Sequence, residues 1–373
     1  MKEKYFTVAK TVSRWKIDTP FENWLGEKAD KSLFWRRLYV LYYRIFDGDY
    51  YKKGIPFIEK EIKRQRYGAE IEKMMGEAIL RLDMIYSLHR FGACFEDYFL
   101  YRFYDLNVIG RQKYNTLKMQ YGYCELVNSA EIRNLFEDKG KCYDLLKPFY
   151  KRDLFVVISR NDAKGLVDFI KKHSSFIYKP LNGHSGIGIK IYRDFDFSNN
   201  SNLEALVSQG DGKFVVEELI IQAPEMAVLH KESINTIRIA TFTVNNEVTI
   251  LGAALRVGTG TANVDNAGAG GMYASVDADE GIVNSIARNN LGYTSLRHPD
   301  TGVIFPGFVI PEWENAIKLV KQMAVTVKGA TVISWDLAYS TKGWLMIEGN
   351  DVGDPYLLQA PLQTPIKKKY YNI

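Results

Sequence analysis

The feature that most constrains the fold of this chain is a change of hydrophobic pattern near residue 150. Upstream of it, apolar and aromatic residues recur every three or four positions, which is the spacing of amphipathic helices. Downstream, short β-rich runs are separated by glycine and polar turns. The pattern therefore predicts an all-helical N-terminal region over residues 1–105, followed by an α+β part with one lobe at 106–215 and a second at 216–373.

Each region has a definite set of expected elements. In the helical region the apolar face of one helix is expected to comprise Phe34, Leu38, Leu41, Tyr42 and Ile45. That helix should end at residues 47–49, and further helices are expected at about 56–75 and through Met84 to Phe91. The expected strands are Phe155–Ile158, Phe176–Lys179, Ile187–Tyr192, Phe214–Glu218, Thr236–Val244, Val248–Val257 and Met272–Val276, with helices at Asp162–His173 and Glu312–Val327. Asn245-Asn246 should form a hairpin turn, because asparagine tolerates positive φ.

Composition bounds the class of protein. The chain has 373 residues, of which 46% are hydrophobic and 25% charged, which is typical of globular proteins. Its net charge of +5 is too diffuse for a nucleic-acid-binding protein but is compatible with anionic ligands. Cys94, Cys124 and Cys142 have no paired or zinc-type spacing and are expected to be reduced thiols of a cytoplasmic protein. No signal-like or membrane-spanning apolar run is found in the sequence.

The N-terminal region is dense in aromatic and basic residues between Lys31 and about Tyr104. A basic run, Lys60 to Arg66, falls within the second expected helix. Such a surface could contact an anionic membrane or a charged polymer. A solvated helical bundle with an aromatic core explains the same composition, and the sequence alone favours that interpretation.

A glycine-rich hairpin is the first candidate site. The strand that ends in Lys179 leads into a loop that contains Asn182, Gly183, His184, Ser185, Gly186 and Gly188. Glycines let backbone N–H groups approach an anion, and a lysine at the strand edge supplies charge to phosphate oxygens. The loop is neither a Walker A loop nor a Rossmann turn, since neither a GKS/T motif nor a following helix is present. A flexible hairpin without a ligand has the same pattern, and His184 could equally lie on the surface.

A second candidate is the end of the strand Phe214–Glu218. Glu217, Glu218, Leu219 and Ile220 could place backbone amides on an adenine edge, and Glu225 could accept hydrogen bonds from ribose hydroxyls. Taken alone, the pattern is better explained by solvated carboxylates at a strand end.

The third candidate is a hairpin of the strands Val332–Ser340 and Trp344–Asn350 around Thr341-Lys342-Gly343. If Ser340 pairs with Trp344, Asp336 stands opposite Glu348, and Asn350 projects from the same face. Like charges that face each other destabilise a sheet, and a cation would remove the conflict. Oxygen ligands without histidine or cysteine suit Mg²⁺. A tolerated acidic pair on an exposed face is the alternative, but the apolar flanks indicate a covered sheet and favour the metal.

In this order the three motifs resemble the ATP-grasp superfamily. The resemblance depends on Lys179 before the glycine-rich loop, Glu218-x-x-Ile-x-x-Pro-Glu225, and Asp336 followed by Glu348-x-Asn350. The segments that are similar to the narrower sugar-transfer-associated ATP-grasp family are Tyr98–Leu106, Asn235–Arg238, Leu255–Gly258, Val264–Asn266 and Gly270-Gly271. The resemblance covers about residues 85–373 and implies two α+β lobes that clasp ATP.

The resemblance also implies roles for individual residues. Lys179 and an earlier lysine, either Lys139 or Lys141, would contact the nucleotide. Residues 182–188 would be the flap over the phosphates, Glu217 to Ile220 the adenine hinge, and Glu225 the ribose ligand. Magnesium would be bound by Asp336, Glu348 and Asn350. The ligases often carry arginine where this chain has Ser334, so Arg238 and Arg256 become candidates for stabilising the reacting anion, with ordinary strand arginines as the alternative.

The implied reaction is amide formation by an ATP- and Mg²⁺-dependent carboxylate–amine ligase through an acylphosphate, on a sugar or surface-polysaccharide precursor. A kinase acting on a sugar hydroxyl, and a non-catalytic nucleotide-binding scaffold in contact with glycosyltransferases or the inner membrane, remain alternatives. Residues 258–271 could form an acceptor-side loop or a simple connection. The expected partners are carboxylate and amine substrates and no nucleic acid, and the expected location is the cytoplasm, with peripheral membrane contact left open.

Overall fold

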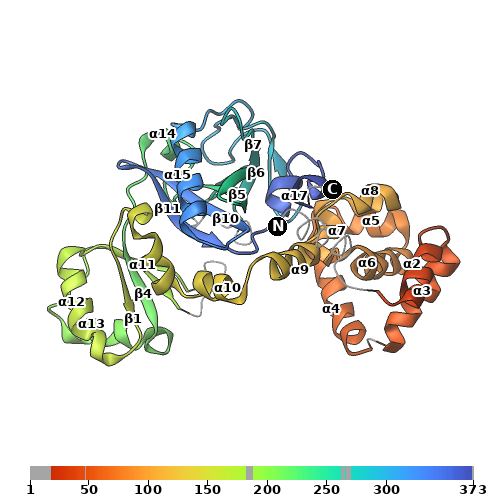
Figure 1. Ribbon diagram of the computed structural model, residues 1–373, viewed down its shortest axis with the longest axis horizontal. Coiled ribbons are helices and arrows are strands. Elements are labelled where there is room, and N and C mark those ends of the chain that lie inside the picture. Colours follow the sequence, from red (N-terminus) through yellow and green to blue (C-terminus); the bar gives the residue numbers. More distant parts are fainter. Residues whose placement is uncertain (1–17, 47, 182–187, 262–264, 266–269, 372–373) are drawn as a thin grey trace.

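The computed structural model describes residues 18–46, 48–181, 188–261, 265 and 270–371. Figure 1 shows an elongated molecule with a helical region at one end, a large sheet in the middle and a smaller sheet at the other end. The two sheets contain four and seven strands. None of the described helices is long and apolar enough to cross a membrane.

The helical region continues well beyond residue 105. Its helices are α2 (Pro20–Ala29), α3 (Leu33–Phe46), α4 (Gly48–Arg64), α5 (Gly68–Met75), α6 (Glu77–Phe91), α7 (Phe95–Leu100), α8 (Val108–Gln112), α9 (Leu117–Val127), α10 (Ala130–Glu137) and α11 (Lys139–Tyr150). The single helix expected at about 56–75 is in fact two helices, and Pro56 lies inside α4. The chain leaves the helix after Arg64 because the Arg66 N–H donates to the carbonyl of Leu291, at 2.8 Å.

The apolar face predicted for α3 is wrong for Phe34, Leu41 and Ile45, which are exposed, while Leu38 and Tyr42 pack against the core as half-buried residues. The buried residues of this helix are Tyr39, Val40 and Tyr43, whereas Phe34 and Ile45 are 63% and 65% exposed. Apart from its arginines, every residue of α3 is apolar or aromatic. Because helical spacing therefore fits more than one face of α3, the sequence could not show which face is buried.

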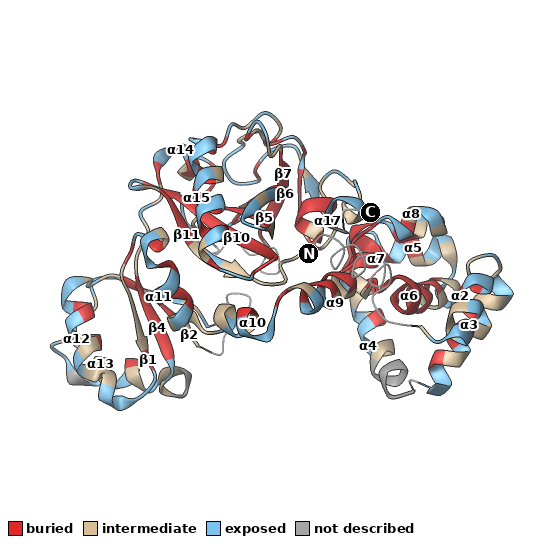
Figure 2. Cartoon of the chain, in the orientation of Figure 1, coloured by how far each residue is buried: buried red, intermediate tan, exposed pale blue. Residues whose placement is uncertain are grey.

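A buried carboxylate, Asp83, and a half-buried one, Asp30, hold the helices of this region together. Asp83 of α6 accepts hydrogen bonds from Arg36 of α3, from Arg111 of α8 and from the Tyr98 hydroxyl. Asp30, after α2, makes a bidentate pair with Arg90 at 2.9 and 2.7 Å. Figure 2 shows buried residues concentrated along α6 in the centre of the bundle.

The smaller sheet is antiparallel, with strand order β1-β4-β2-β3. Its strands are β1 (Leu154–Val157), β2 (Phe176–Pro180), β3 (Lys190–Tyr192) and β4 (Phe214–Glu218). Helices α12 (Ala163–Lys172) and α13 (Asn200–Val207) supply Leu166, Phe169, Ile170 and Leu206 to its core. Because β4 pairs with both β1 and β2, the predicted lobe boundary after residue 215 falls inside this strand.

The larger sheet has the order β11-β10-β5-β6-β7-β8-β9. Its strands are β5 (Thr236–Val244), β6 (Glu247–Val257), β7 (Met272–Val276), β8 (Ala287–Arg288), β9 (Thr294–Ser295), β10 (Val332–Ser340) and β11 (Gly343–Asn350). One core contains side chains of this sheet and of α15 (Trp313–Thr326), and a second contains side chains of the sheet and of the helical region. Short helices lie at α14 (Pro224–Ala227), α16 (Tyr356–Gln359) and α17 (Lys367–Tyr371). The predicted turn at Asn245-Asn246 is confirmed, with φ of 53° and 64°.

The hairpin of β10 and β11 differs from its prediction in one respect. Ser340 pairs with Gly343 rather than Trp344, so the turn contains only Thr341 and Lys342. An irregularity beside Asp336 then shifts the register by one residue, because Ile347 has no partner in the ladder. Asp336 is consequently opposite Glu348, as predicted, although the turn was assigned one residue too long.

Candidate functional site

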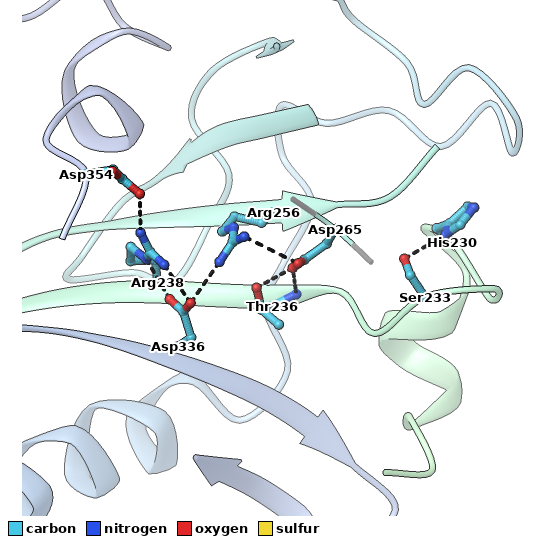
Figure 3. A network of polar contacts seen from close by, with 8 residues as sticks. All are labelled: His230, Ser233, Thr236, Arg238, Arg256, Asp265, Asp336 and Asp354. Carbon is cyan, nitrogen blue, oxygen red and sulfur yellow. Dashed lines mark hydrogen bonds and ion pairs between the residues drawn. The ribbon is translucent and has the colours of Figure 1, made fainter. Parts of the chain in front are cut away.

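Asp336 is the centre of a buried charge network on the larger sheet (Figure 3). Arg238 of β5 donates to both of its carboxylate oxygens, at 2.6 and 2.7 Å, and Arg256 of β6 donates to Oδ2 at 2.8 Å. Burial alone would raise the pKa of Asp336, but the two guanidinium groups outweigh burial and hold that pKa below its ordinary value. The site therefore contains a carboxylate anion between two fixed cations.

Two further carboxylates extend this network outward. Asp354, after β11, accepts from Arg238 Nη1 at 2.8 Å, and Asp265 lies 3.5 Å from Arg256 Nη2. Asp265 also accepts hydrogen bonds from the backbone and the hydroxyl of Thr236. The 258–271 segment, for which the sequence left open an acceptor-side loop or a simple connection, thus contacts Arg256 through Asp265.

Glu348 and Asn350 border the network and differ from it in having few partners. Glu348 keeps part of its surface in contact with solvent but is surrounded closely by protein, and it makes no hydrogen bond or ion pair among the described residues. Desolvation by the surrounding protein, and then the facing Asp336 carboxylate, raise the pKa of Glu348. The Asn350 amide Nδ2 is buried without a hydrogen-bond partner. Its two ends can be exchanged by rotating the amide, so this position can also present an oxygen.

The donor set fits a hard cation. A carboxylate offers about four lone-pair sites, and Asp336 uses three of them on the arginines. One site on Asp336 Oδ1, the carboxylate of Glu348 and the amide oxygen of Asn350 remain, and all are oxygen ligands of the kind that Mg²⁺ prefers. Magnesium coordination by these residues remains a prediction.

A second buried carboxylate, Glu217 on β4 of the smaller sheet, is linked to the larger sheet through Arg152. It accepts from Arg152 at 3.0 and 2.6 Å and lies 2.7 Å from Lys179 Nζ. Arg152 also donates to the carbonyls of Met346, at 2.5 Å, and Ile347, at 3.3 Å. Burial would raise the pKa of Glu217, but Lys179 and Arg152 lower it to about 2. Arg152 therefore links the lysine on β2 to the irregular stretch of β11 that precedes Glu348.

The two lysines at the start of α11, both candidates for contacting the nucleotide, have different surroundings. Lys139 Nζ donates to the carbonyl of Leu181 at 3.3 Å. Desolvation lowers the pKa of Lys139, Glu348 opposes this effect, and Lys179 adds to it, so all three groups share one electrostatic environment. Lys141 instead pairs with Asp138, and its side chain is 72% exposed. The geometry favours Lys139 as the earlier lysine.

The remaining predicted positions lie apart from the buried charges. The Glu218 side chain accepts from the Asp153 backbone and pairs with Lys342, on the side opposite Glu217, as alternation along a strand requires. It forms an acidic and histidine cluster with Asp153 and His173, which lysines neutralise. Leu219 and Ile220 are half-buried, and Glu225 is exposed in the first turn of α14. Asn182, Gly183, His184, Ser185 and Gly186 lie outside the described residues, and Gly188 has a positive φ of 78°.

Arg152 and Asp354 are the site residues that sequence reasoning missed. Neither belongs to a recognisable motif, because each acts through contacts between segments far apart in the chain. His230 was classed among scattered histidines. It makes hydrogen bonds with Ser233 and with the carbonyl of Gly260, and so holds the start of the 258–271 segment. Figure 3 shows that His230 lies apart from Asp336.

The sequence model of the sugar-transfer associated ATP-grasp family matches residues 118–372. Since this is more than half of the chain, the protein belongs to that family, which confirms the predicted family and the α+β ATP-grasp fold behind a helical N-terminal region. No curated protein matches the chain in sequence.

Several solved ATP-grasp structures are similar to this chain at low identity. The ATP-grasp ligase PsnB complexed with a phosphomimetic variant of its minimal precursor, Mg and ADP is 11% identical, with a TM-score of 0.40, over 69% of this chain and 65% of that one. D-alanine–D-alanine ligase from Helicobacter pylori is 14% identical, with a TM-score of 0.39, over 66% of this chain and 62% of that one. The chain thus spans just under two thirds of the length of each.

Proposed function

We propose that this protein is an ATP- and Mg²⁺-dependent carboxylate–amine ligase. The observation that carries the proposal is that, among the described residues, the Glu348 carboxylate and Asn350 Nδ2 have no partner although they lie beside the Arg238–Asp336–Arg256 network. Two facing carboxylates repel each other unless a cation lies between them, and the buried Asn350 amide has no partner to explain its burial. Membership of the ATP-grasp family supplies the nucleotide as the ligand class.

The lysines are suited to bind the triphosphate. An ammonium group has three donors, and Lys179 uses one on Glu217. The others can serve phosphate oxygens, while Glu217 and Arg152 hold the lysine in place. Lys139 approaches the same region from α11. The backbone at Glu217 to Ile220 would receive the adenine, and Glu225 the ribose.

In the proposed reaction an oxygen of the substrate carboxylate attacks the γ-phosphorus, and ADP leaves. An amine then attacks the acyl carbon of the acylphosphate, loses a proton and displaces phosphate. Bound Mg²⁺, held by Asp336, Glu348 and Asn350, would neutralise charge on the phosphates. Arg256, whose guanidinium also contacts Asp336 and Asp265, would stabilise the developing anion, while Arg238 holds the Asp336 carboxylate.

The acceptor that we propose is a sugar or a surface-polysaccharide precursor that receives an amino-acid-like group. The description of the family as sugar-transfer associated supports this assignment. PsnB is a ligase that is complexed with a peptide precursor, so peptides belong among the compounds to be tested.

Purified protein incubated with ATP, Mg²⁺ and panels of sugar acids, amino sugars, amino acids and peptides tests the proposal. We expect ADP and phosphate to appear in step with an amide product. A stable phosphorylated sugar would identify a kinase instead, and nucleotide binding without turnover for any pair would identify a scaffold. AMP and pyrophosphate as products would contradict the acylphosphate route.

A further inference from the structure

The outer surface of α2 and α3 is apolar and aromatic where a solvated bundle should be polar. Its exposed residues, together named here the α2–α3 face, are Phe21, Trp24, Phe34, Leu41, Ile45 and Phe46, which are between 45% and 72% exposed. They are continuous rather than scattered, and a contiguous patch of this kind marks an interaction surface.

Ring contacts join this face into one surface. Phe46 contacts Tyr42, Tyr42 contacts Phe21 and Phe21 contacts Trp24, with ring centroids 4.6, 5.5 and 5.9 Å apart. Trp24 then contacts Trp35, and Trp35 contacts Phe34, at 5.4 and 5.7 Å. Packing among these rings fixes their positions and leaves their outer sides uncovered.

The charge of this face is positive. Helix α3 has arginines at positions 36, 37 and 44 and no acidic residue. Arg36 is used inside the bundle by Asp83, whereas Arg37 is exposed and makes no ion pair among the described residues. On α2, Lys28 lies seven residues after Phe21 and so shares its side of the helix. Glu27, beside it, is the exposed acid of α2.

We propose that the α2–α3 face binds the surface of a lipid bilayer that contains anionic lipids. A helix with aromatic and aliphatic residues on its outer side and arginines along the border is typical of segments that lie in the membrane interface. Tryptophan and tyrosine favour that zone, and basic residues are attracted to anionic headgroups.

The length of α3 determines how the helix would meet a bilayer, and charge and position favour a bilayer over a second copy of the chain. At 14 residues and about 1.5 Å per residue, α3 is too short to cross the hydrocarbon core, so it can only lie along the surface. A second copy of this chain would bring the same cations together across a two-fold interface, which is unfavourable. Figure 1 also places α2 and α3 at the end of the molecule far from the smaller sheet, where a flat surface can approach.

Co-sedimentation of the full chain with vesicles tests the proposal. We expect binding to equimolar phosphatidylcholine and phosphatidylglycerol vesicles, weaker binding to pure phosphatidylcholine, and a decrease with salt. Phe34→Ser with Ile45→Ser should lower the partition coefficient at least about tenfold, and Arg37→Glu about tenfold on the anionic vesicles only. Both variants change exposed side chains, and unchanged thermal melting would show that they fold.

Ile158→Ser is the matched control, because Ile158 is 60% exposed, close to the 65% of Ile45, and follows β1 in the smaller sheet. It should bind vesicles like the wild type. Failure of the wild type to bind anionic vesicles at low salt, or equal binding by the double variant, would overturn the proposal. A dimer in sedimentation velocity that Phe34→Ser with Ile45→Ser dissociates would assign the face to a second copy and overturn it as well. None of these readouts depends on the nucleotide reaction.

Discussion

Asp83 in the helical region and Asp336 in the larger sheet are both buried carboxylates that bind two arginines. Asp83 accepts four hydrogen bonds, three from Arg36 and Arg111 and one from Tyr98. Asp336 accepts three, all from Arg238 and Arg256. The first carboxylate has every lone-pair site occupied, while the second keeps one beside Glu348 and Asn350.

This difference teaches which buried charges to associate with function. Burial and paired arginines are common to both sites, so neither property distinguishes them. Each site also has one buried nitrogen without a partner, Arg36 Nε beside Asp83 and Asn350 Nδ2 beside Asp336. What distinguishes the sites is that a second carboxylate, Glu348, faces Asp336 and makes no ion pair among the described residues. We therefore interpret the Asp83 network as structural and the Asp336 network as functional.

The largest effect that would separate the two sites is expected from Glu348→Gln. We expect turnover with ATP and Mg²⁺ to fall by about a thousandfold, equivalent to about 4 kcal/mol of activation free energy. Stability should not decrease. The raised pKa of Glu348 means that the folded state disfavours the ionised carboxylate. The free energy of unfolding therefore decreases as pH rises from the ordinary carboxyl pKa to the raised one. The neutral amide of glutamine removes this loss of stability.

Steady-state kinetics and thermal melting at neutral pH check this prediction, with Glu314→Gln, an exposed acid on α15, as the control. A variant that loses stability but keeps its turnover would place Glu348 in a structural role and remove the contrast with Asp83.

The second prediction concerns the Asp83 network, in which every lone-pair site of the carboxylate is occupied. Asp83→Asn leaves Arg36 and Arg111 without their anion in a buried position and should cost about 3–5 kcal/mol of folding free energy. Chemical denaturation measures this loss. The KM for ATP of the folded variant should stay near that of the wild type, because Asp83 lies in the helical bundle. A stable variant with a changed KM would show that the helical region takes part in nucleotide binding.

The strands could be predicted well from sequence because their signals are local. The ranges of β4, β5 and β7 agree with prediction, since each is a β-rich run closed by turn residues. The opposition of Asp336 and Glu348 was also predicted, although the register depends on a bulge at Ile347 that no local signal indicates.

Contacts between distant segments could not be predicted in this way. Arg152 contacts Glu217, 65 positions away, and Met346, 194 positions away. Neither separation leaves a pattern in a single sequence. The prediction of the buried face of α3 failed for a different reason. Only the three arginines of this helix are charged, and one of them, Arg36, turns inward to pair with the buried Asp83, so the arginines do not mark the outer face.

The third prediction sharpens the comparison with an intermediate case, Glu217, which is fully paired but contacts a candidate nucleotide lysine. Its pKa falls from an ordinary 4.5 to about 2 in the folded state. A lowered carboxyl pKa stabilises the fold above the ordinary value, and this contribution of about 3 kcal/mol should be lost as pH falls from about 4.5 towards 2. Denaturation of wild type and Glu217→Gln across this range measures the difference. An equal pH dependence in both proteins would mean that Lys179 and Arg152 do not hold this carboxylate ionised.

The smallest effect is expected from the lysines of α11, which differ only in their surroundings. Lys139 shares the environment of Glu348 and Lys179, whereas Lys141 is exposed and pairs with Asp138. Lys139→Ala should raise the KM for ATP about tenfold, or about 1.4 kcal/mol, while Lys141→Ala should change it less than twofold, because exposed pairs contribute little. Steady-state kinetics of the two variants checks this ordering, and each serves as the control for the other. A larger effect at Lys141 would contradict this assignment, because it would mean that the opposite face of α11 meets the nucleotide. Lys139 would then lie away from Glu348, and the negative charge of Glu348 beside Asp336 would lose its nearby cation.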